Sequence, residues 1–160
     1  MSAPASEARF VTLALGDEVF AVPVDYVREI LEFQRPSPVP EAPPYMLGLT
    51  DVRGRATPTI DLRLKLGWPA VEPTLSTRVL VLDIPIEGRV LALGLVADQV
   101  IEVAAFSADQ IEPAPDIGVR WKSDYIRGVV RQERGFVVLF DLPRLLTSTE
   151  AAALPSAQAA

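Results

Sequence analysis

Two Asp-Leu pairs are the residues in this sequence whose type and spacing could support acid-base chemistry. Asp61-Leu62 and Asp141-Leu142 each end an apolar run, and they stand eighty positions apart. Two carboxylates that lie together can share a proton and activate water, as in the aspartic proteases. In those enzymes Thr-Gly follows the Asp directly, whereas Leu follows here, which favours an aspartate that caps a short helix. A carboxylate-dependent hydrolase is therefore an alternative that requires Asp61 and Asp141 to lie within hydrogen-bonding distance.

The composition argues against most other kinds of site. The chain of 160 residues contains no histidine and no cysteine, so it lacks the commonest metal ligand, the usual acid-base side chain near pH 7 and every thiol. No acidic run has the spacing of a calcium loop, and we expect no metal and no cofactor. The formal net charge of −6 has the wrong sign for a nucleic-acid surface.

Membrane insertion and secretion are also not expected. No apolar stretch approaches the roughly 18 uninterrupted residues of a membrane span. The N-terminus lacks the basic start and continuous apolar block of a secretory signal. The sequence therefore predicts a cytoplasmic protein without direct membrane insertion.

Short apolar runs separated by Gly, Pro and Asp predict a mainly β protein. Alternating apolar residues over 10–15 and 19–24 flank Gly16-Asp17, a pattern typical of a hairpin. A second hairpin is predicted over 48–60, with its turn at Arg53-Gly54. Each hairpin offers one apolar face that must be buried against another element.

The second half of the chain repeats the first. Residues 20–29 have counterparts at 93–102, at an offset of 73, and five later residues recur at an offset of eighty. Closing a sheet of about five short strands into a barrel removes its exposed edges. The sequence therefore predicts two pseudo-repeated five-stranded small β-barrels packed together, with short capping helices. The predicted boundaries are one subdomain over about 8–67, a second over about 77–147, and flexible termini at 1–7 and 148–160. The five later pairs are Tyr45/Tyr125, Gly48/Gly128, Asp61/Asp141, Leu62/Leu142 and Leu66/Leu146.

Positive charge is concentrated around one predicted hairpin of this acidic protein. The predicted hairpin and the residues after it contain Arg53, Arg55 and Arg63. Apolar Leu49 and Val52 stand next to them in the sequence. Guanidinium groups beside apolar side chains suit a partner interface, while Arg53-Gly54 alone is equally typical of a plain turn. From the residues, both interpretations stay open.

The same segment resembles the signature of CheW-type coupling proteins. It reads Tyr45-Met-Leu-Gly-Leu-Thr-Asp-Val-Arg-Gly-Arg-Ala-Thr-Pro-Thr-Ile-Asp-Leu-Arg63. Those proteins carry Gly-(hydrophobic)-x-Asn-Leu-Arg-Gly followed by Pro-(hydrophobic)-(hydrophobic)-Asp-Leu-Arg, and similar flanking segments extend the resemblance over roughly 8–147. Asp51 stands where Asn is usual, and we expect its negative charge to neutralise Arg53 in part. The matching signature positions are Gly48, Arg53, Gly54, Pro58, Asp61 and Arg63.

The resemblance implies a non-catalytic adaptor that links chemoreceptors to a CheA-type histidine kinase in bacterial chemotaxis. One surface would bind the regulatory domain of the kinase and another the cytoplasmic tip of a methyl-accepting chemoreceptor, which would recruit the protein to membrane-associated receptor arrays. A CheW-like scaffold for another kinase pathway, such as surface motility or gene regulation, is the alternative. The partner-binding positions carried over from the family are Val27, Glu29, Gly48, Leu49, Arg53 and Gly54.

Overall fold

Strands make up most of the residues that the structure describes. The computed structural model describes residues 7–113, 125–133 and 135–147, so the predicted flexible termini lie outside the described residues apart from position 7. The elements, in chain order, are β1 (Ala8–Leu15), β2 (Glu18–Pro23), the 3-10 helix η1 (Val24–Tyr26), β3 (Val27–Glu32), β4 (Met46–Val52), β5 (Arg55–Asp61), α1 (Leu62–Lys65), β6 (Arg78–Ile86), β7 (Arg89–Ala97), β8 (Gln99–Phe106), the 3-10 helix η2 (Ala108–Gln110), β9 (Ile111–Glu112), β10 (Ile126–Gln132), β11 (Gly135–Phe140) and α2 (Leu142–Thr147).

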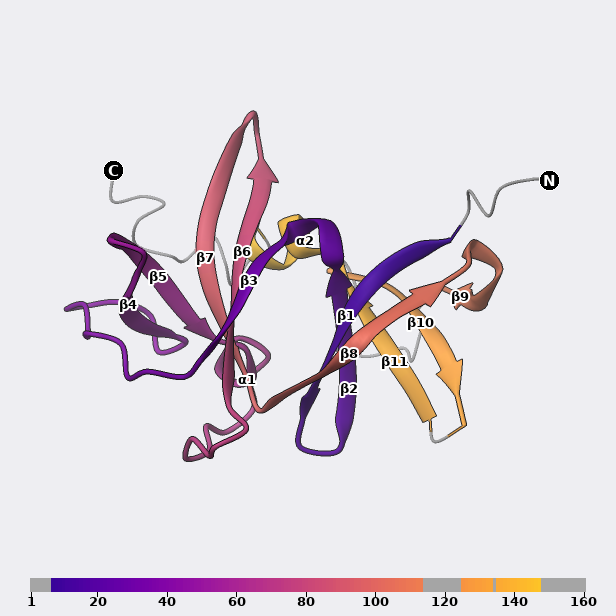
Figure 1. The fold of residues 1–160 in the computed structure, drawn as a ribbon, viewed down its shortest axis with the longest axis horizontal. Helices are drawn as coiled ribbons and strands as arrows, with labels where there is room; N and C mark the ends of the chain where they lie inside the picture. Colours follow the sequence, from indigo (N-terminus) through magenta and orange to yellow (C-terminus); the bar gives the residue numbers. More distant parts are fainter. Residues whose placement is uncertain (1–6, 114–124, 134, 148–160) are drawn as a thin grey trace.

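The strands form two sheets, each curled into a half-barrel, that lie beside one another (Figure 1). One sheet has the order β8-β1-β2-β11-β10-β9, and the other has the order β3-β6-β7-β5-β4. Pairing is antiparallel except between β2 and β11 and between β5 and β7, which are parallel. The prediction of a mainly β protein with two small barrels and short helices is confirmed, with the two-residue β9 as a sixth strand of one sheet.

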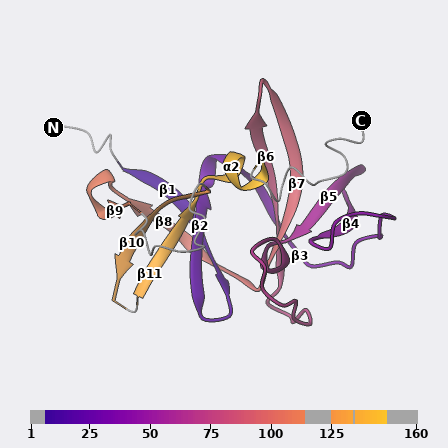
Figure 2. The same cartoon turned by 180° about the vertical axis from the view of Figure 1, so that it is seen from behind.

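The two halves of the chain exchange their first hairpins. The β1–β2 hairpin from the first half pairs with β8 and β11, and the β6–β7 hairpin from the second half pairs with β3 and β5. The parallel pairings have equivalent registers, because Thr59 faces Gly94 in one sheet and Leu139 faces Ala21 in the other. Leu139 is eighty positions after Thr59, and Gly94 is 73 positions after Ala21, as the sequence repeat requires. Both sheets thus contain strands from both predicted subdomains, about 8–67 and about 77–147. Figure 2 shows β2 and β11 from behind.

A shared apolar core joins the sheets. Its largest cluster combines residues from the inner faces of β1 and β2 with residues of β5, β6 and β7. Leu13, Leu80 and Leu95 are fully buried in it, and burying a leucine side chain contributes roughly 1.5–3 kcal/mol. The exchanged hairpins therefore stabilise both sheets at once, since neither half of the chain supplies a complete core alone.

The end of each repeat has the same local geometry. Asp61 N donates to Tyr45 O and Asp141 N donates to Tyr125 O, both at 2.8 Å. The Asp61 carboxylate accepts the Arg63 N–H at 2.9 Å, and the Asp141 carboxylate accepts the Arg144 N–H at 3.1 Å. Both aspartates therefore cap the short helix that follows, as their sequence context predicts.

Candidate partner-binding site

The β4–β5 turn directs the Arg53 side chain outwards. Arg53 and Gly54 occupy the two central turn positions with φ of 51° and 83°, the pair of positive values that a type I′ hairpin turn requires. Asp51 Oδ1 accepts the Gly54 N–H at 2.9 Å. Asp51 thus stabilises the turn through the backbone, whereas we expected it to neutralise Arg53.

Arg53 instead forms a bidentate ion pair with Glu29. Arg53 Nε lies 3.0 Å from Glu29 Oε2, and Arg53 Nη2 lies 2.9 Å from Glu29 Oε1. The Arg53 side chain is 77% exposed and that of Glu29 is 16% exposed. Glu29 lies on β3 and Arg53 follows β4, and these are the two outer strands of the five-stranded sheet. The pair therefore bridges the open seam of this barrel with a geometry well suited to guanidinium and carboxylate.

The ion pair also favours the charged forms of its two members. Hydrogen bonds from Arg53 hold the pKa of Glu29 below its usual value, although desolvation acts in the opposite direction. The same hydrogen bonds raise the pKa of Arg53. A carboxyl group with a depressed pKa loses its stabilising contact only as the pH falls, so the pair is ionised near neutral pH.

Gly48 allows the segment before β4 to cross close to the strand. Ser37 N donates to Leu49 O at 2.9 Å, and Leu49 N donates to Ser37 O at 2.8 Å. Gly48 has φ of 143°, and a Cβ atom there would lie 2.0 Å from Ser37 O. This position must remain glycine for the two backbones to pair, so Gly48 shapes the site without presenting a side chain to a partner.

The other positions carried over from the family differ in exposure. Leu49 points outwards with 36% of its surface exposed. Val27 is only partly exposed and packs against the main core. A Cβ at Gly54 would meet no atom within 4 Å, so that glycine serves the turn alone. The structure brings Glu29 and Arg53 together and leaves Leu49 as the apolar side chain among the six that is available to a partner.

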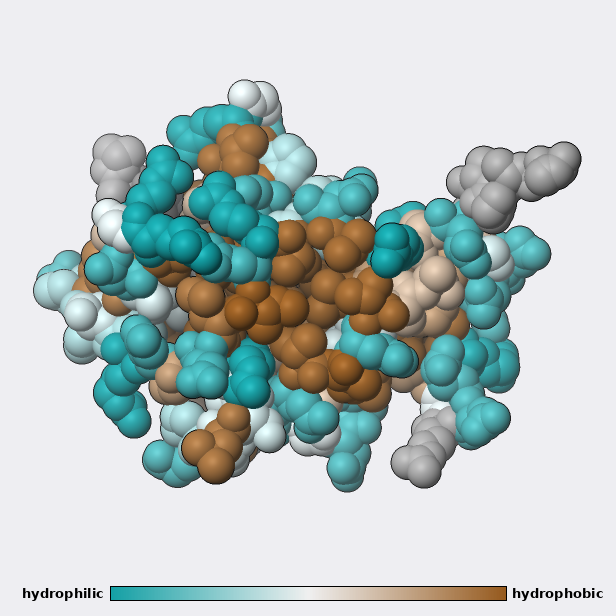
Figure 3. All heavy atoms as spheres, in the orientation of Figure 1, coloured by the Kyte–Doolittle hydropathy of each residue, from teal (hydrophilic) through white to brown (hydrophobic). Residues whose placement is uncertain are grey.

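Sequence reasoning missed three exposed apolar residues on equivalent strands. Ile30 lies on β3, and Ile101 and Val103 lie on β8, where water would favour polar side chains. Figure 3 shows an apolar area over the middle of the molecule, where β3, β1 and β8 cross the view, with hydrophilic side chains around it. The sequence contained one sign of this surface. Ile30 is an apolar residue that shares the outward face of β3 with the charged residues Arg28 and Glu32. Contiguous apolar surface of this kind marks an interaction site.

The predicted arginine cluster does not form. Arg53 lies in the turn before β5 and Arg55 is the first residue of that strand, whereas Arg63 lies in α1, after the strand ends. The two ends of β5 are separated by roughly 20 Å, at about 3.3 Å per residue. Arg63 is half-buried and pairs with Asp98 at 2.7 Å. The three arginines therefore lie at opposite ends of β5, and Leu49 pairs with Pro58, midway between those ends.

Asp61 and Asp141 show helix-capping geometry in place of a paired-carboxylate site. Each carboxylate accepts a backbone N–H of its own helix, and the two helices occupy separate places beside the sheets (Figure 1). Burial raises the pKa of Asp61 above its usual value, and the backbone N–H groups of Arg63 and Leu64 oppose this only in part. The geometry thus matches the capping interpretation.

Replacing Asp61 with asparagine is expected to leave stability at pH 7 within about 1 kcal/mol of wild type, because Asn retains an oxygen acceptor for the cap. Asp61→Ala removes the cap and should cost about 0.5–2 kcal/mol. The raised pKa means that the folded state keeps the Asp61 proton to a higher pH than the unfolded state does. The contribution of this carboxyl group to folding stability is therefore fully present below the ordinary pKa of 3.8 and is lost as the pH rises through the raised pKa. Urea unfolding of both variants from pH 3 to 7 measures this. Equal losses for Asn and Ala would contradict it.

The residues that the structure describes contain no group of three or more His, Cys, Asp or Glu side chains placed to hold a metal ion. Within the same residues, no helix has the length and apolar character needed to cross a membrane.

Comparison with known proteins shows which family the chain resembles. The family model described as "CheW-like domain" matches residues 9–150. The chain belongs to the CheW-like family. It is 33% identical over 140 residues to the chemotaxis protein CheW of Rhizobium meliloti, with 88% of each chain covered. It is 32% identical over 143 residues to chemotaxis protein CheW of Klebsiella aerogenes, covering 89% of this chain and 84% of that one.

A solved structure agrees with the fold. The scaffolding protein TtCheW from Thermoanaerobacter tengcongensis superposes with a TM-score of 0.77 at 22% identity, covering 89% of this chain and 90% of that chain. At this identity the superposition supports the two-barrel fold, while the sequence matches support the family. The protein is therefore a CheW-type coupling and scaffold protein of chemotaxis.

Proposed function

We propose that this protein is a non-catalytic adaptor that joins a CheA-type histidine kinase to the cytoplasmic tip of a chemoreceptor. The observation that carries the proposal is the Arg53–Glu29 pair at the rim of one barrel, in which Arg53 is exposed, on the same hairpin as the outward-facing Leu49. A rim of charge around apolar surface is the usual anatomy of a reversible protein interface. Charged rims fix the register of a complex and contribute less to its affinity.

Two surfaces suit the two proposed partners. The β4–β5 hairpin with Leu49 and Arg53 suits the regulatory domain of the kinase. The apolar area over β3 and β8 spans both sheets and suits the helical tip of a receptor (Figure 3). Binding there would recruit the protein from the cytoplasm to membrane-associated receptor arrays without inserting it into the bilayer.

Replacing Leu49 with aspartate is expected to weaken binding to the kinase regulatory domain about tenfold or more, because it puts a charge into the apolar part of the interface. Leu75→Asp is the matched control, since Leu75 is 96% exposed in the segment between α1 and β6. Isothermal titration of purified wild type and both variants measures the two affinities. Equal affinities for all three proteins would overturn the assignment of this surface, and absence of wild-type binding would overturn the proposed function.

A CheW-like scaffold in another kinase pathway is the second candidate. Protein FrzA of Myxococcus xanthus is 31% identical over 127 residues, covering 78% of this chain and 75% of that one. The chemotaxis proteins CheW of Rhizobium meliloti and Klebsiella aerogenes cover more of the chain than FrzA does, which favours the chemotaxis role. Titration of the same surface against kinases from both kinds of pathway separates the candidates.

A further inference from the structure

Within the described residues, Asp98 occupies one of two places where the chain passes from one sheet to the other. β7 ends at Ala97 in the five-stranded sheet, and β8 begins at Gln99 in the six-stranded sheet. The other passage runs through η1, between β2 and β3. A crossing of a single residue leaves little backbone to absorb a change of angle, so the Asp98 side chain is well placed to control that angle.

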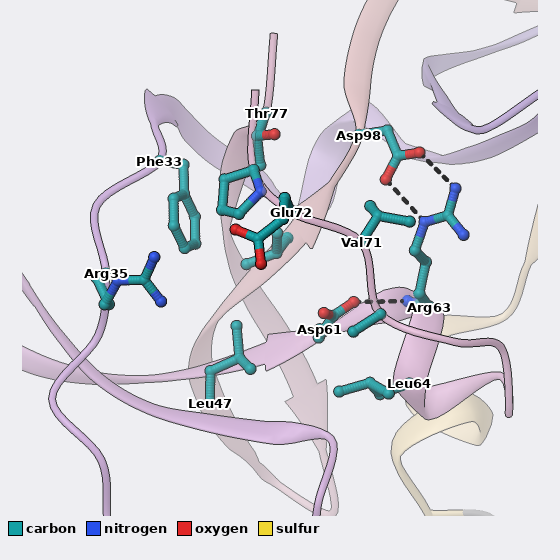
Figure 4. Close-up of a pocket in the computed structure, with 13 residues that line it drawn as sticks. Phe33, Arg35, Leu47, Asp61, Arg63, Leu64, Val71, Glu72, Thr77 and Asp98 are labelled. Atoms are coloured by element: carbon teal, nitrogen blue, oxygen red, sulfur yellow. Dashed lines mark hydrogen bonds and ion pairs between the residues drawn. The ribbon is translucent and has the colours of Figure 1, made fainter. Parts of the chain in front are cut away.

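The Asp98 carboxylate binds groups from both sheets. Arg63 Nε donates to Oδ1 at 3.0 Å and Arg63 Nη2 donates to Oδ2 at 2.7 Å (Figure 4). Gly16 N donates to the same Oδ2 at 2.8 Å. Arg63 belongs to α1, directly after β5 of one sheet, while Gly16 forms the β1–β2 turn of the other. One carboxylate thus links α1, the β1–β2 turn and the crossing between β7 and β8.

The surrounding side chains support this three-way contact. Gly16 has φ of 60°, and a Cβ atom there would lie 3.3 Å from Arg63 Nη2, so the guanidinium packs against bare backbone. The Arg63 guanidinium also lies 5.9 Å from the centroid of the Trp68 ring. Trp68 in turn meets the ring of Phe20 on β2 edge-on, with centroids 5.9 Å apart. An apolar contact between the sheets therefore runs beside the polar one.

The ion pair is partly shielded from water and remains ionised. The side chains of Arg63 and Asp98 are 14% and 27% exposed. Hydrogen bonds from Arg63 lower the pKa of Asp98, with a further contribution from the Gly16 N–H. A bidentate guanidinium pair is directional, so it adds an angular constraint to the non-directional attraction of the shared apolar core.

We propose that Asp98 is a positioning residue that fixes the angle between the two barrels and thereby shapes the apolar area used for partner binding. The strands over which that area lies carry exposed apolar side chains, which are Ile30 on β3 of one sheet and Ile101 and Val103 on β8 of the other. β8 starts at the residue after Asp98. Rotating the sheets would move these apolar side chains relative to one another and change the surface that a partner meets.

Distance measurements between the barrels test this directly. The chain has no cysteine, so Ala56→Cys on β5 and Gln132→Cys on β10, both exposed, accept one spin label on each sheet. Asp98→Asn should broaden the distance distribution from double electron–electron resonance about twofold. Asp83→Asn is the matched control, because Asp83 accepts an equally bidentate pair from Arg28 within one sheet, and it should leave the distribution unchanged.

Two further measurements separate positioning from simple loss of stability. Arg63→Lys keeps the charge but loses the bidentate geometry, and it should broaden the distribution as Asp98→Asn does. Thermal unfolding should shift similarly for Asp98→Asn and Asp83→Asn. An unchanged distribution in both Asp98→Asn and Arg63→Lys, or equal broadening in Asp83→Asn, would overturn the proposal.

The link to partners rests on the proposed function and is measured separately. Affinity for a receptor-tip fragment should fall at least fivefold in Asp98→Asn, while affinity for the kinase regulatory domain should change less than twofold. Broadened distances with unchanged receptor affinity would overturn the partner role of Asp98. If wild type bound neither fragment, the proposed function would fail, whereas the distance measurement would still decide whether Asp98 sets the angle.

Discussion

Gly48→Ala is expected to lower the free energy of unfolding by about 3 kcal/mol or more, the largest effect of any single substitution at the six candidate positions. The added Cβ would lie 2.0 Å from Ser37 O and 2.6 Å from Ser37 C. Those atoms belong to a backbone that pairs with Leu49 through two hydrogen bonds. Relief of the overlap therefore requires the loss of that pairing or a shift of β4. Urea unfolding monitored by circular dichroism measures the loss.

Gly54→Ala is the matched control for this substitution. Its φ of 83° also disfavours a side chain, but a Cβ there would meet no atom within 4 Å. Strain in the left-handed region alone costs about 1–2 kcal/mol. A loss at Gly48 no greater than that at Gly54 would contradict the steric explanation and leave only the unusual backbone angle.

Arg53→Glu is expected to reduce coupling of receptor to kinase strongly, with binding to the kinase regulatory domain weakened about tenfold or more. The new carboxylate would lie beside Glu29 and Asp51, replacing attraction with repulsion at the rim. Because the pair is largely exposed on the Arg53 side, the free energy of unfolding should change little. A reconstituted mixture of receptor, kinase and adaptor measures coupling, and thermal unfolding measures stability.

The charge-swapped double variant Glu29→Arg/Arg53→Glu separates two explanations. Exchanging the charges restores attraction across the seam between β3 and β4, so thermal stability should return towards wild type. If the partner contacts Arg53 directly, binding should stay weak in the double variant. If the pair acts only by closing the barrel, binding should recover together with stability. Normal coupling in Arg53→Glu itself would show that this residue has no part in partner recognition.

The local structure of the chain could be predicted from its sequence. Alternating apolar residues predicted the first two hairpins, and Arg53-Gly54 predicted a turn with two positive φ angles. The recurrence of Asp61 and Asp141 predicted two capped helices. These features depend on residues a few positions apart, whose backbone preferences and side-chain hydrogen bonds act within one turn or one strand.

The long-range pairings were decided by the tertiary structure. A repeat makes the β1–β2 and β6–β7 hairpins nearly equivalent partners for either sheet, so the sequence pattern alone does not say which hairpin enters which barrel. Arg53 was predicted to interact with Asp51 because the two are close in sequence, but the Arg53 guanidinium group pairs with Glu29, 24 positions away. Arg63 was grouped with Arg53 and pairs instead with Asp98 across the barrel junction. Sequence therefore determined the repeat, the turns, the caps and the family. Only the closing of the sheets placed the charges opposite one another, because ion pairing depends on distance in space and not on separation along the chain.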